Sequence, residues 1–380
     1  MPRPTPLACL LALLAFSPTT RAADPDLPPG VTQPLVLAPG PGNPRNSEGD
    51  FVRLKSGRVL FVYTHFTGGT GDAAAAVLAA RHSDDAGRTW SATDEVLVKQ
   101  LGKQNVMSVS LQRLADGRVG LFYLVKNSKD DCRPFVQYSA DEAKTWTDPK
   151  PCVPDPVYLV MNNNRVVQLQ KTKPGRIVLP VARHDWAKDK KGEHRGVATC
   201  YLSDDNGATF RKAESDLEAP PESRSGLQEP LVIELKDGGL LMLCRTDRGS
   251  QFRSTSTDGG VTWTPAEPTD IKSPLSPASI ARIPKTGDLL MAWNDHAAEL
   301  DPKFKGKRTP FTVAISRDDG RTWTNRKTLY ADPLGWYCYT AIAFADDRVL
   351  LGHCAGQQVK GSSGLATTVV TAFDVDWLYR

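Results

Sequence analysis

An eight-residue motif, S-x-D-x-G-x-T-W, recurs five times and constrains the fold more than any other feature of the chain. Three copies are close to this pattern and two are looser, and their first serines lie 56, 64, 53 and 60 residues apart. The copies are Ser83–Trp90, Ser139–Trp146, Ser203–Phe210, Ser256–Trp263 and Ser316–Trp323. A repeat of this length, filled with short apolar runs, is typical of a β-propeller, in which each repeat forms one sheet of a ring.

The residue types in the motif suit a tight turn. The aspartate can cap the turn, the glycine can adopt the left-handed conformation, and the aromatic residue can cover the hairpin. Near-identical acidic residues spread around a ring fit fold repetition better than a single active site. We therefore interpret these aspartates as structural residues.

A second repeat gives the number of blades. A turn followed by a β-rich run occurs six times, and its first residues are spaced by 60, 58, 63, 49 and 60 positions. These first residues are Gly57, Gly117, Gly175, Gly238, Gly287 and Asp347. The pattern predicts an all-β chain that forms one six-bladed β-propeller over residues 41–380, preceded by an N-terminal extension over residues 23–40. Five motifs in six blades fit, since a terminal repeat is often atypical.

The first 22 residues have the features of a secretory signal peptide. Arg3 precedes an apolar run from Leu7 to Phe16, and small residues follow at Ala22 and Ala23. The run is too short to span a bilayer, so we expect no membrane insertion. The pattern predicts export, either to the periplasm or out of the cell.

Composition and charge narrow the classes of ligand and partner that the chain could bind. The formal net charge is +4, and basic residues are interleaved with acidic ones, which argues against nucleic acid as a ligand. No CxxC pair occurs, so we predict no metal site, and no motif indicates a cofactor. The six cysteines beyond the signal peptide could be buried free thiols or disulfides, with Cys132–Cys152 the most local pair. We predict a monomer.

The repeat also sorts residues by face. In a four-stranded antiparallel blade, the starts of first strands, the ends of second strands and the starts of third strands share one mouth, and the Asp motifs lie at the opposite end. The candidate mouth residues include Arg45, Glu48, Asp50, Asp72, Asn164, Glu229, Arg245, Asn294, Arg308, Tyr337 and Tyr339. Several arginines beside a few carboxylates and tyrosines favour a small anionic ligand.

At these residues the chain resembles the sialidases (neuraminidases) that carry Asp-box repeats, over nearly all of residues 41–380. The resemblance implies that three arginines, Arg45, Arg245 and Arg308, hold the substrate carboxylate. The first arginine of the family lies in an Arg-Ile-Pro motif, whereas this chain has Arg45-Asn-Ser. Glu48 could therefore orient Arg45 or line an altered pocket, and Asp50, Asn164 and Asn294 are further candidates for substrate binding.

The resemblance also implies the catalytic roles. Asp72 matches the acid/base, and Tyr339 matches the nucleophile, assisted by Glu229; Tyr337 remains an alternative to Tyr339. A neutral tyrosine avoids the repulsion that a carboxylate nucleophile would meet at the acidic anomeric centre, which makes sialidases an exception among glycosidases. Arginines can hold a carboxylate by charge-assisted hydrogen bonds. To act as an acid, Asp72 would need a pKa raised by the apolar residues 73–76.

Three functions fit these observations. The first is an exported exo-sialidase that releases terminal sialic acid from glycoconjugates with retention of configuration. The second is a related glycosidase that acts on another acidic sugar. The third is a non-catalytic propeller that binds a glycan or a protein.

Overall fold

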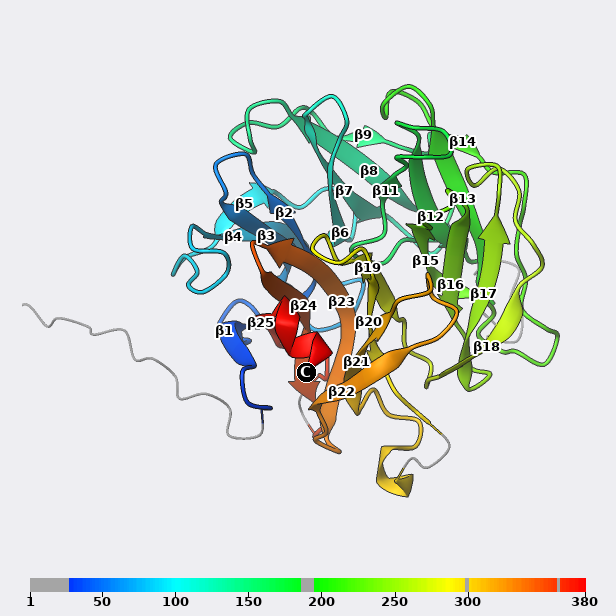
Figure 1. The fold of residues 1–380 in the computed structure, drawn as a ribbon. Coiled ribbons are helices and arrows are strands. Elements are labelled where there is room, and N and C mark those ends of the chain that lie inside the picture. The colour runs from blue at the N-terminus through cyan, green and yellow to red at the C-terminus, as the bar shows by residue number, and fades with distance from the viewer. Residues whose placement is uncertain (1–26, 186–194, 298–300, 361–362) are drawn as a thin grey trace, which may run out of the picture.

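The chain folds into a ring of six sheets around a central axis (Figure 1). This computed structural model describes residues 27–185, 195–297, 301–360 and 363–380. The helical segments within these ranges are two short 3-10 turns, Pro302–Phe304 and Val375–Tyr379. The predicted all-β, six-bladed β-propeller is confirmed.

Each blade takes its strands in chain order from the centre of the ring outward, apart from the last. The first two blades comprise β2 (Arg45–Arg53), β3 (Val59–Phe66), β4 (Ala76–Ser83) and β5 (Glu95–Val98), then β6 (Asn105–Arg113), β7 (Val119–Lys126), β8 (Cys132–Ser139) and β9 (Lys150–Pro151). The third comprises β10 (Leu159–Val160), β11 (Val167–Gln168), β12 (Ile177–Arg183), β13 (Val197–Ser203) and β14 (Arg211–Lys212). Its inner edge is split, because β10 and β11 both pair with β12.

The remaining blades complete the ring. The fourth comprises β15 (Gln228–Glu234), β16 (Leu240–Arg245), β17 (Ser250–Ser256) and β18 (Glu267–Lys272), and the fifth β19 (Ser279–Arg282), β20 (Leu289–Asn294), β21 (Phe311–Ser316) and β22 (Thr324–Tyr330). The sixth comprises β23 (Gly335–Ala345), β24 (Arg348–Gln357), β25 (Thr368–Asp374) and, at its outer edge, β1 (Thr32–Leu37). All neighbouring strands within the blades pair antiparallel.

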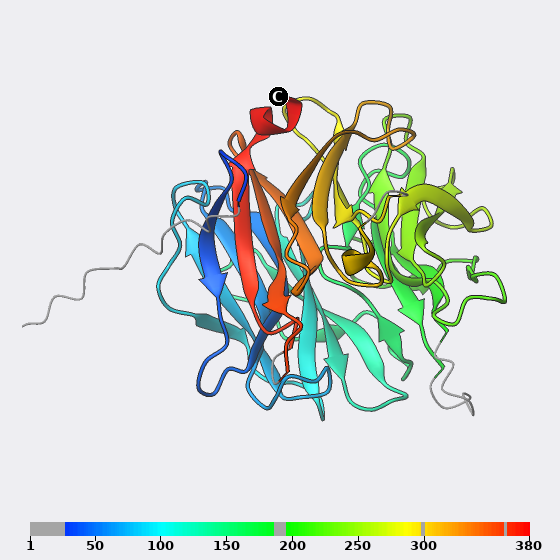
Figure 2. The ribbon, with the colours of Figure 1, turned by 90° about the horizontal axis from the view of Figure 1, so that it is seen from below.

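Strand β1 closes the ring, and this corrects the boundary drawn from the sequence. Residues 32–37 fall in the stretch predicted to be an extension outside the propeller, yet they pair with β25, with Leu35 opposite Val370 and Leu37 opposite Thr368. Figure 2 shows β1 beside β25. The last blade thus combines both ends of the described chain, so that β25 is not an exposed edge strand.

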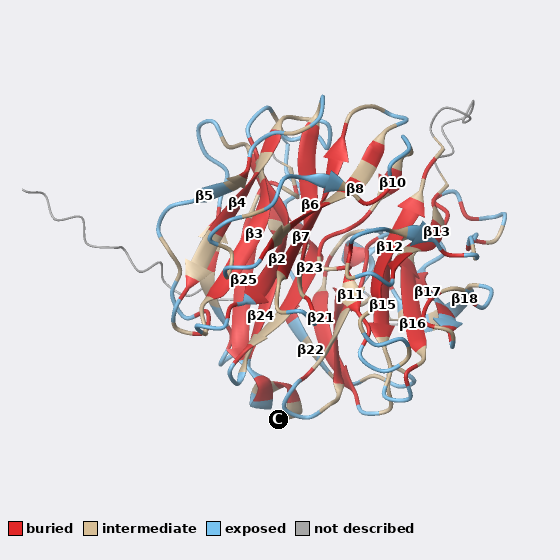
Figure 3. Cartoon of the chain, turned by 90° about the horizontal axis from the view of Figure 1, so that it is seen from above, coloured by how far each residue is buried: buried red, intermediate tan, exposed pale blue. Residues whose placement is uncertain are grey.

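Apolar side chains fill the spaces between consecutive blades. One cluster joins the first two blades through residues such as Val62, Leu78, Val106 and Leu121, and similar clusters join the other neighbours. Figure 3 shows that burial follows the strands, while the connecting loops are mostly exposed or partly exposed. The core is therefore a ring of interfaces, and the centre of the molecule is left to polar side chains.

The five Asp motifs form one repeated hydrogen-bonded turn. In the first, Asp85 Oδ1 accepts from the Thr89 N–H at 2.8 Å and Asp85 Oδ2 from the Thr89 hydroxyl at 2.6 Å, while Ser83 Oγ accepts from the Gly87 N–H at 2.8 Å. The same bonds recur in the other four copies, which agrees with a structural role for these aspartates.

The Asp motifs also mark one end of the blades. In the first blade, Ser83 at the motif pairs with Val59, whereas Phe66 pairs with Ala76 at the other end of the same strands. The loop from β3 to β4, which carries Asp72, therefore lies at the end opposite the Asp motif. This is the arrangement predicted from the repeat.

The structure bears to different extents on the expectations for the signal peptide, for membrane insertion and for the cysteines. Residues 1–22, the predicted signal peptide, lie outside the described residues. Within the described ranges, no helix is both long and apolar enough to cross a membrane. The six cysteines from Cys132 to Cys354 are all buried, with free thiols.

We predict that the apolar face of β1 contributes strongly to stability. Leu35 and Leu37 are 8% and 5% exposed, whereas Val36 between them is half-buried. Replacing Leu35 and Leu37 together by alanine should lower the free energy of unfolding by about 4 kcal/mol or more, since each large-to-small core change costs about 2–5 kcal/mol. Urea denaturation measures this, with Val36→Ala as the control. An equal midpoint for the double variant and the control would contradict the closing role of β1.

Candidate active site

The innermost strands share a backbone irregularity at the centre of the ring. In β2, β6, β15 and β23 the register shifts by one residue, which marks a β-bulge. At each bulge one non-glycine residue takes a left-handed conformation: Glu48 (φ 49°), Ser108 (φ 60°), Glu229 (φ 48°) and Tyr339 (φ 57°). A bulge redirects a side chain out of the normal alternation of a strand.

All four bulge residues line one cavity of about 210 Å³ at the centre of the ring. Asp72, Lys126, His184, Gln228 and Arg245 also line it. Because each blade contributes its first strand, residues separated by nearly 300 positions in sequence meet there. Polar groups that converge in one cavity make it the candidate active site.

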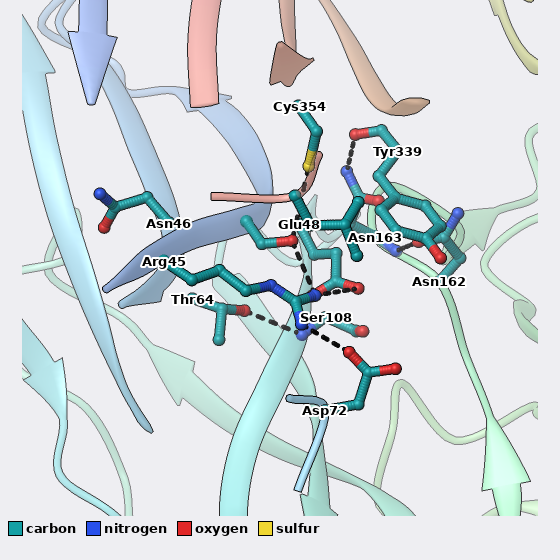
Figure 4. Close-up of polar contacts among 12 residues, drawn as sticks. Arg45, Asn46, Glu48, Thr64, Asp72, Ser108, Asn162, Asn163, Tyr339 and Cys354 are labelled. Atoms are coloured by element: carbon teal, nitrogen blue, oxygen red, sulfur yellow. Dashed lines mark hydrogen bonds and ion pairs between the residues drawn. The ribbon is translucent and has the colours of Figure 1, made fainter. Parts of the chain in front are cut away.

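Arg45 lies beneath the cavity and is engaged by several partners (Figure 4). It is 1% exposed. Its Nη1 donates to Asp72 Oδ1 at 2.5 Å and to the Thr70 carbonyl at 3.1 Å, and its Nη2 donates to Ser47 Oγ at 3.2 Å and lies 3.4 Å from Glu48 Oε2. Both terminal nitrogens of Arg45 therefore bind the protein itself.

Asp72 is held at the rim of the cavity. Its side chain is 63% exposed, and its backbone carbonyl accepts from Asn105 Nδ2 and from Lys126 Nζ, both at 2.9 Å. The partial loss of solvent at the rim raises the pKa of Asp72, but the charge and hydrogen bond of Arg45, together with Lys126 and Arg308, bring its pKa below the usual value. The raised pKa expected from residues 73–76 is therefore wrong, because a guanidinium outweighs the apolar neighbours.

Glu48 has the opposite electrostatic environment. Its carboxyl group lines the cavity but is only 5% exposed. Burial raises the pKa of Glu48 to about 8, against the lowering effect of Arg45, and the negative charges of Asp72 and Glu229 raise it further. Two carboxyl groups that face one guanidinium thus differ in protonation at neutral pH.

Glu229 and Tyr339 meet on the other side of the cavity. Glu229 Oε2 lies 3.1 Å from Arg245 Nη1, and Gln228 Oε1 accepts from Arg245 Nε at 3.0 Å and Nη2 at 2.7 Å. Burial and the charge of Glu229 raise the pKa of the Tyr339 phenol, against the effect of Arg308 and Arg245. The tyrosine is therefore neutral in the free protein, next to a carboxylate that can take its proton.

Arg308 keeps two buried donors without a hydrogen bond. It packs against the Tyr339 ring, with its guanidinium carbon 5.1 Å from the ring centre, and 5.0 Å from that of Trp336. Among the described residues, Arg308 Nε and Nη1 are buried polar atoms without a hydrogen-bond partner, whereas Arg245 Nη1 is engaged in the ion pair with Glu229 Oε2. Such donors are costly unless a ligand satisfies them, and a carboxylate matches their charge and geometry.

The two candidate tyrosines lie in different surroundings. Tyr337 packs in the apolar core between the fifth and sixth blades, where its ring lies 4.8 Å from that of Tyr330. Tyr339 occupies the bulge of β23 and lines the cavity. Figure 4 shows Tyr339 beside Asn163, whose Nδ2 donates to the Tyr339 carbonyl at 2.9 Å.

Five residues proposed for substrate binding are placed outside the cavity lining: Arg45 and Arg308, described above, and Asp50, Asn164 and Asn294. Asp50 is buried, and its carboxylate accepts from the N–H groups of Phe51 and Leu111, each at 2.7 Å, and from Asn164 Nδ2 at 2.8 Å. Asn164 Oδ1 in turn accepts from the Ile342 N–H at 3.2 Å. Asn294 is buried and donates to the Pro310 carbonyl at 3.3 Å. These side chains satisfy backbone groups of neighbouring blades.

Several cavity residues were given no role from the sequence. Lys126 is nearly buried, and its ammonium group lies 5.7 Å from the centre of the Tyr158 ring. An apolar wall adjoins it, formed by Met107, Leu124, Cys132, Val160 and Met161. Lys126 ends a second strand, which the repeat places at the mouth, whereas Val160 and Met161 come from the irregular inner edge of the third blade, where the repeat gives no signal. In the described ranges, no group of three or more His, Cys, Asp or Glu residues is placed to hold a metal ion.

Comparisons with known proteins agree with this fold. Residues 65–352 match the model of the BNR repeat-like domain family. A curated sialidase of Micromonospora viridifaciens is 28% identical over 148 residues, which are 38% of this chain and 22% of that protein. The chain thus matches only about a fifth of the length of this relative.

Solved structures show the same architecture at low identity. A Dyadobacter fermentans protein of unknown function aligns with a TM-score of 0.70 and 18% identity, over 91% of this chain and 100% of that one. A leech intramolecular trans-sialidase, complexed with 2,7-anhydro-Neu5Ac, aligns with a TM-score of 0.70 and 14% identity, over 91% of this chain and 70% of that one.

The fold and the central polar cavity define a β-propeller with a candidate ligand site at the centre of the ring. The family match covers most of the chain, so the protein belongs to the BNR repeat-like domain family.

We predict that Asp50 acts in stability. Asp50→Ala would leave the N–H groups of Phe51 and Leu111 and the amide of Asn164 without their acceptor, at a cost of about 1–3 kcal/mol for each buried unsatisfied group. We expect the free energy of unfolding to fall by about 3 kcal/mol or more in urea titrations. The exposed Asp155→Ala is the control, expected to change it by about 0.5 kcal/mol or less. Similar midpoints for the two variants would contradict the structural role.

Proposed function

We propose that the protein is an exo-sialidase that releases terminal sialic acid from glycoconjugates. The observation that supports this most is the buried guanidinium of Arg308, whose Nε and Nη1 lack hydrogen-bond partners and which packs against the Tyr339 ring. These donors would bind the carboxylate on the anomeric carbon and hold that carbon next to the phenol. The weak similarity to a curated sialidase points the same way.

Tyr339 would act as the nucleophile and Glu229 as its proton acceptor. A phenol with a raised pKa attacks poorly unless a base removes its proton during the attack. Glu229 is the carboxylate whose charge acts most strongly on that phenol. A glycosyl-tyrosine intermediate hydrolysed by water would give retention of configuration, and Asp72 at the rim is placed to take part in that step.

A second candidate substrate is another acidic sugar. Arg45, which the resemblance assigned to the substrate carboxylate, is buried and bound to Asp72, Ser47 and Thr70. The carboxylate would then be held by Arg245 and Arg308, with Lys126 as a further cation. This arrangement suits a sugar acid whose carboxylate is placed differently from that of sialic acid.

We also propose that the protein is exported after cleavage following Ala22. The apolar run Leu7–Phe16 and the small residues at its end support this. N-terminal sequencing of the protein recovered from outside the cytoplasm should begin at Ala23. A chain that retains Met1 there would contradict the cleavage.

We predict that Tyr339→Phe abolishes turnover while Tyr337→Phe does not. The assay is the release of 4-methylumbelliferone from its sialic acid glycoside. Loss of the phenol oxygen should lower kcat by about 10³-fold or more, the scale seen when a nucleophile is removed. Tyr337→Phe serves as the control, since this ring packs in the core. Proton NMR of the first product should show the retained anomer.

Other outcomes of the assay discriminate the alternatives. If the folded wild type does not hydrolyse the sialic acid glycoside but hydrolyses a glycoside of another acidic sugar, that sugar replaces sialic acid as the proposed substrate. An inactive wild type that only binds acidic glycans would favour a binding propeller. An equal loss of turnover in Tyr339→Phe and Tyr337→Phe would contradict the assignment of the nucleophile.

A further inference from the structure

We propose that Glu48 donates the proton to the departing glycosidic oxygen, and that Asp72 takes the proton of the attacking water. This division of roles rests on the proposed glycosidase function and differs from the single acid/base that the resemblance assigns to Asp72. It follows from how the two carboxyl groups are placed around Arg45.

Asp72 is poorly suited to be the acid in this structure. Its Oδ1 accepts from Arg45 Nη1 at 2.5 Å, and Asn105 and Lys126 anchor its backbone, so the carboxylate is held against the guanidinium. This charge-assisted bond keeps Asp72 ionised in the resting site, so Asp72 holds no proton to give when the glycosidic bond breaks. As a carboxylate at the rim, however, Asp72 is exposed to the water that must be activated.

Glu48 is placed to hold and release a proton. The bulge in β2 turns its carboxyl group into the cavity, where little solvent can stabilise its charge. The ionisable groups that act on it are Arg45 from its own strand, Asp72 from the β3–β4 loop, Glu229 from β15 and Cys354 from β24. Burial and the two carboxylates favour the neutral acid, while Arg45 Nη2, 3.4 Å away, stabilises the carboxylate that forms once the proton has left.

The proton balance of the reaction then closes within the site. In the first half, the Tyr339 oxygen bonds to the anomeric carbon as the glycosidic C–O bond breaks; Glu229 takes the phenol proton and Glu48 gives its proton to the leaving alcohol. In the second half, Asp72 takes a proton from water as the water oxygen displaces Tyr339, which recovers its proton from Glu229. The proton on Asp72 then returns to Glu48 by exchange with water in the cavity that both carboxyl groups line.

The test compares two substrates that differ in their need for an acid. A sialyl lactoside has a poor leaving group that must be protonated, whereas 4-methylumbelliferone leaves with little help. We expect Glu48→Gln to lower kcat/KM for the lactoside by about 10²–10⁴-fold and to change that for the aryl glycoside far less. In the wild type, kcat/KM for the lactoside should fall above about pH 8, where Glu48 loses its proton.

Asp72→Asn is the matched variant. If Asp72 activates water, this change should lower kcat for the aryl glycoside and leave a burst of methylumbelliferone, with kcat/KM nearly unchanged. The reverse pattern, in which Asp72→Asn selectively loses the lactoside and Glu48→Gln affects both substrates equally, would overturn the proposal. Thermal unfolding checks the fold, and Glu48→Gln should keep the wild-type Tm, because an amide mimics a neutral acid.

A second measurement does not depend on turnover. The infrared spectrum of the wild type minus that of Glu48→Gln should show the C=O stretch of a protonated carboxyl group at pH 7, and this difference band should fade as the pH rises through about 8; the subtraction removes the band of Asp50, whose pKa is also raised. If the band is present but no sialoside is hydrolysed, the proposed sialidase function fails while Glu48 still holds its proton. If the band is absent at pH 7, the proposal for Glu48 is overturned even in an active enzyme.

Discussion

The site depends on one backbone constraint, the bulge with a left-handed residue in the inner strands. A non-glycine residue in this conformation costs roughly 1 kcal/mol or more, and the surrounding structure must hold it there. Glu48, Glu229 and Tyr339 all bear this cost. Next to Glu48, an added Cβ on Gly49 would lie 2.5 Å from the Phe61 ring, so close packing fixes the bulge of β2 in place. At each bulge the strained conformation directs the side chain into the cavity, since a regular strand would direct it into the interface between blades.

Buried polar residues near the centre of the ring are of two kinds: some line the cavity, and others join the blades. Asp50 and Asn164 lie one or two positions from cavity residues, yet they join the first, second, third and sixth blades through backbone hydrogen bonds. Burial raises the pKa of Asp50 to about 7 even though these donors lower it. Because its folded pKa exceeds that of an exposed aspartate, this group stabilises the fold less as the pH rises from about 4 to 7. The centre of the ring is thus held by polar contacts where the apolar interfaces end.

The repeats were sufficient to predict the blade count and to bring Glu48 and Glu229 to one cavity, because both follow from counting positions between turns, but the same count also placed Asp50 and Asn164 there, which lie outside the lining. Tyr339 follows from the same count, as it precedes its turn by nearly the same distance as Glu48 and Glu229 precede theirs. The role of β1 could not be predicted, since six residues without a turn motif carry little signal and their partner lies over 330 positions away. The electrostatics could not be predicted either. The lowered pKa of Asp72 depends on the position of Arg45, and neighbours along the chain, the alanines, contribute little.

The charges around the cavity affect both the charge of the ligand that it would bind and the protonation of Glu48. Arg45, Lys126, Arg245 and Arg308 are cationic, Asp72 and Glu229 are anionic, and Glu48 is neutral at pH 7, so the site has excess positive charge. An anionic sugar removes that excess where water is largely excluded and charges interact strongly. Its carboxylate also adds a negative charge near Glu48, which strengthens the hold of Glu48 on its proton. A neutral sugar would do neither. The proposed preference for an acidic ligand and the proposed retention of a proton on Glu48 would therefore both follow from the same arrangement of arginines.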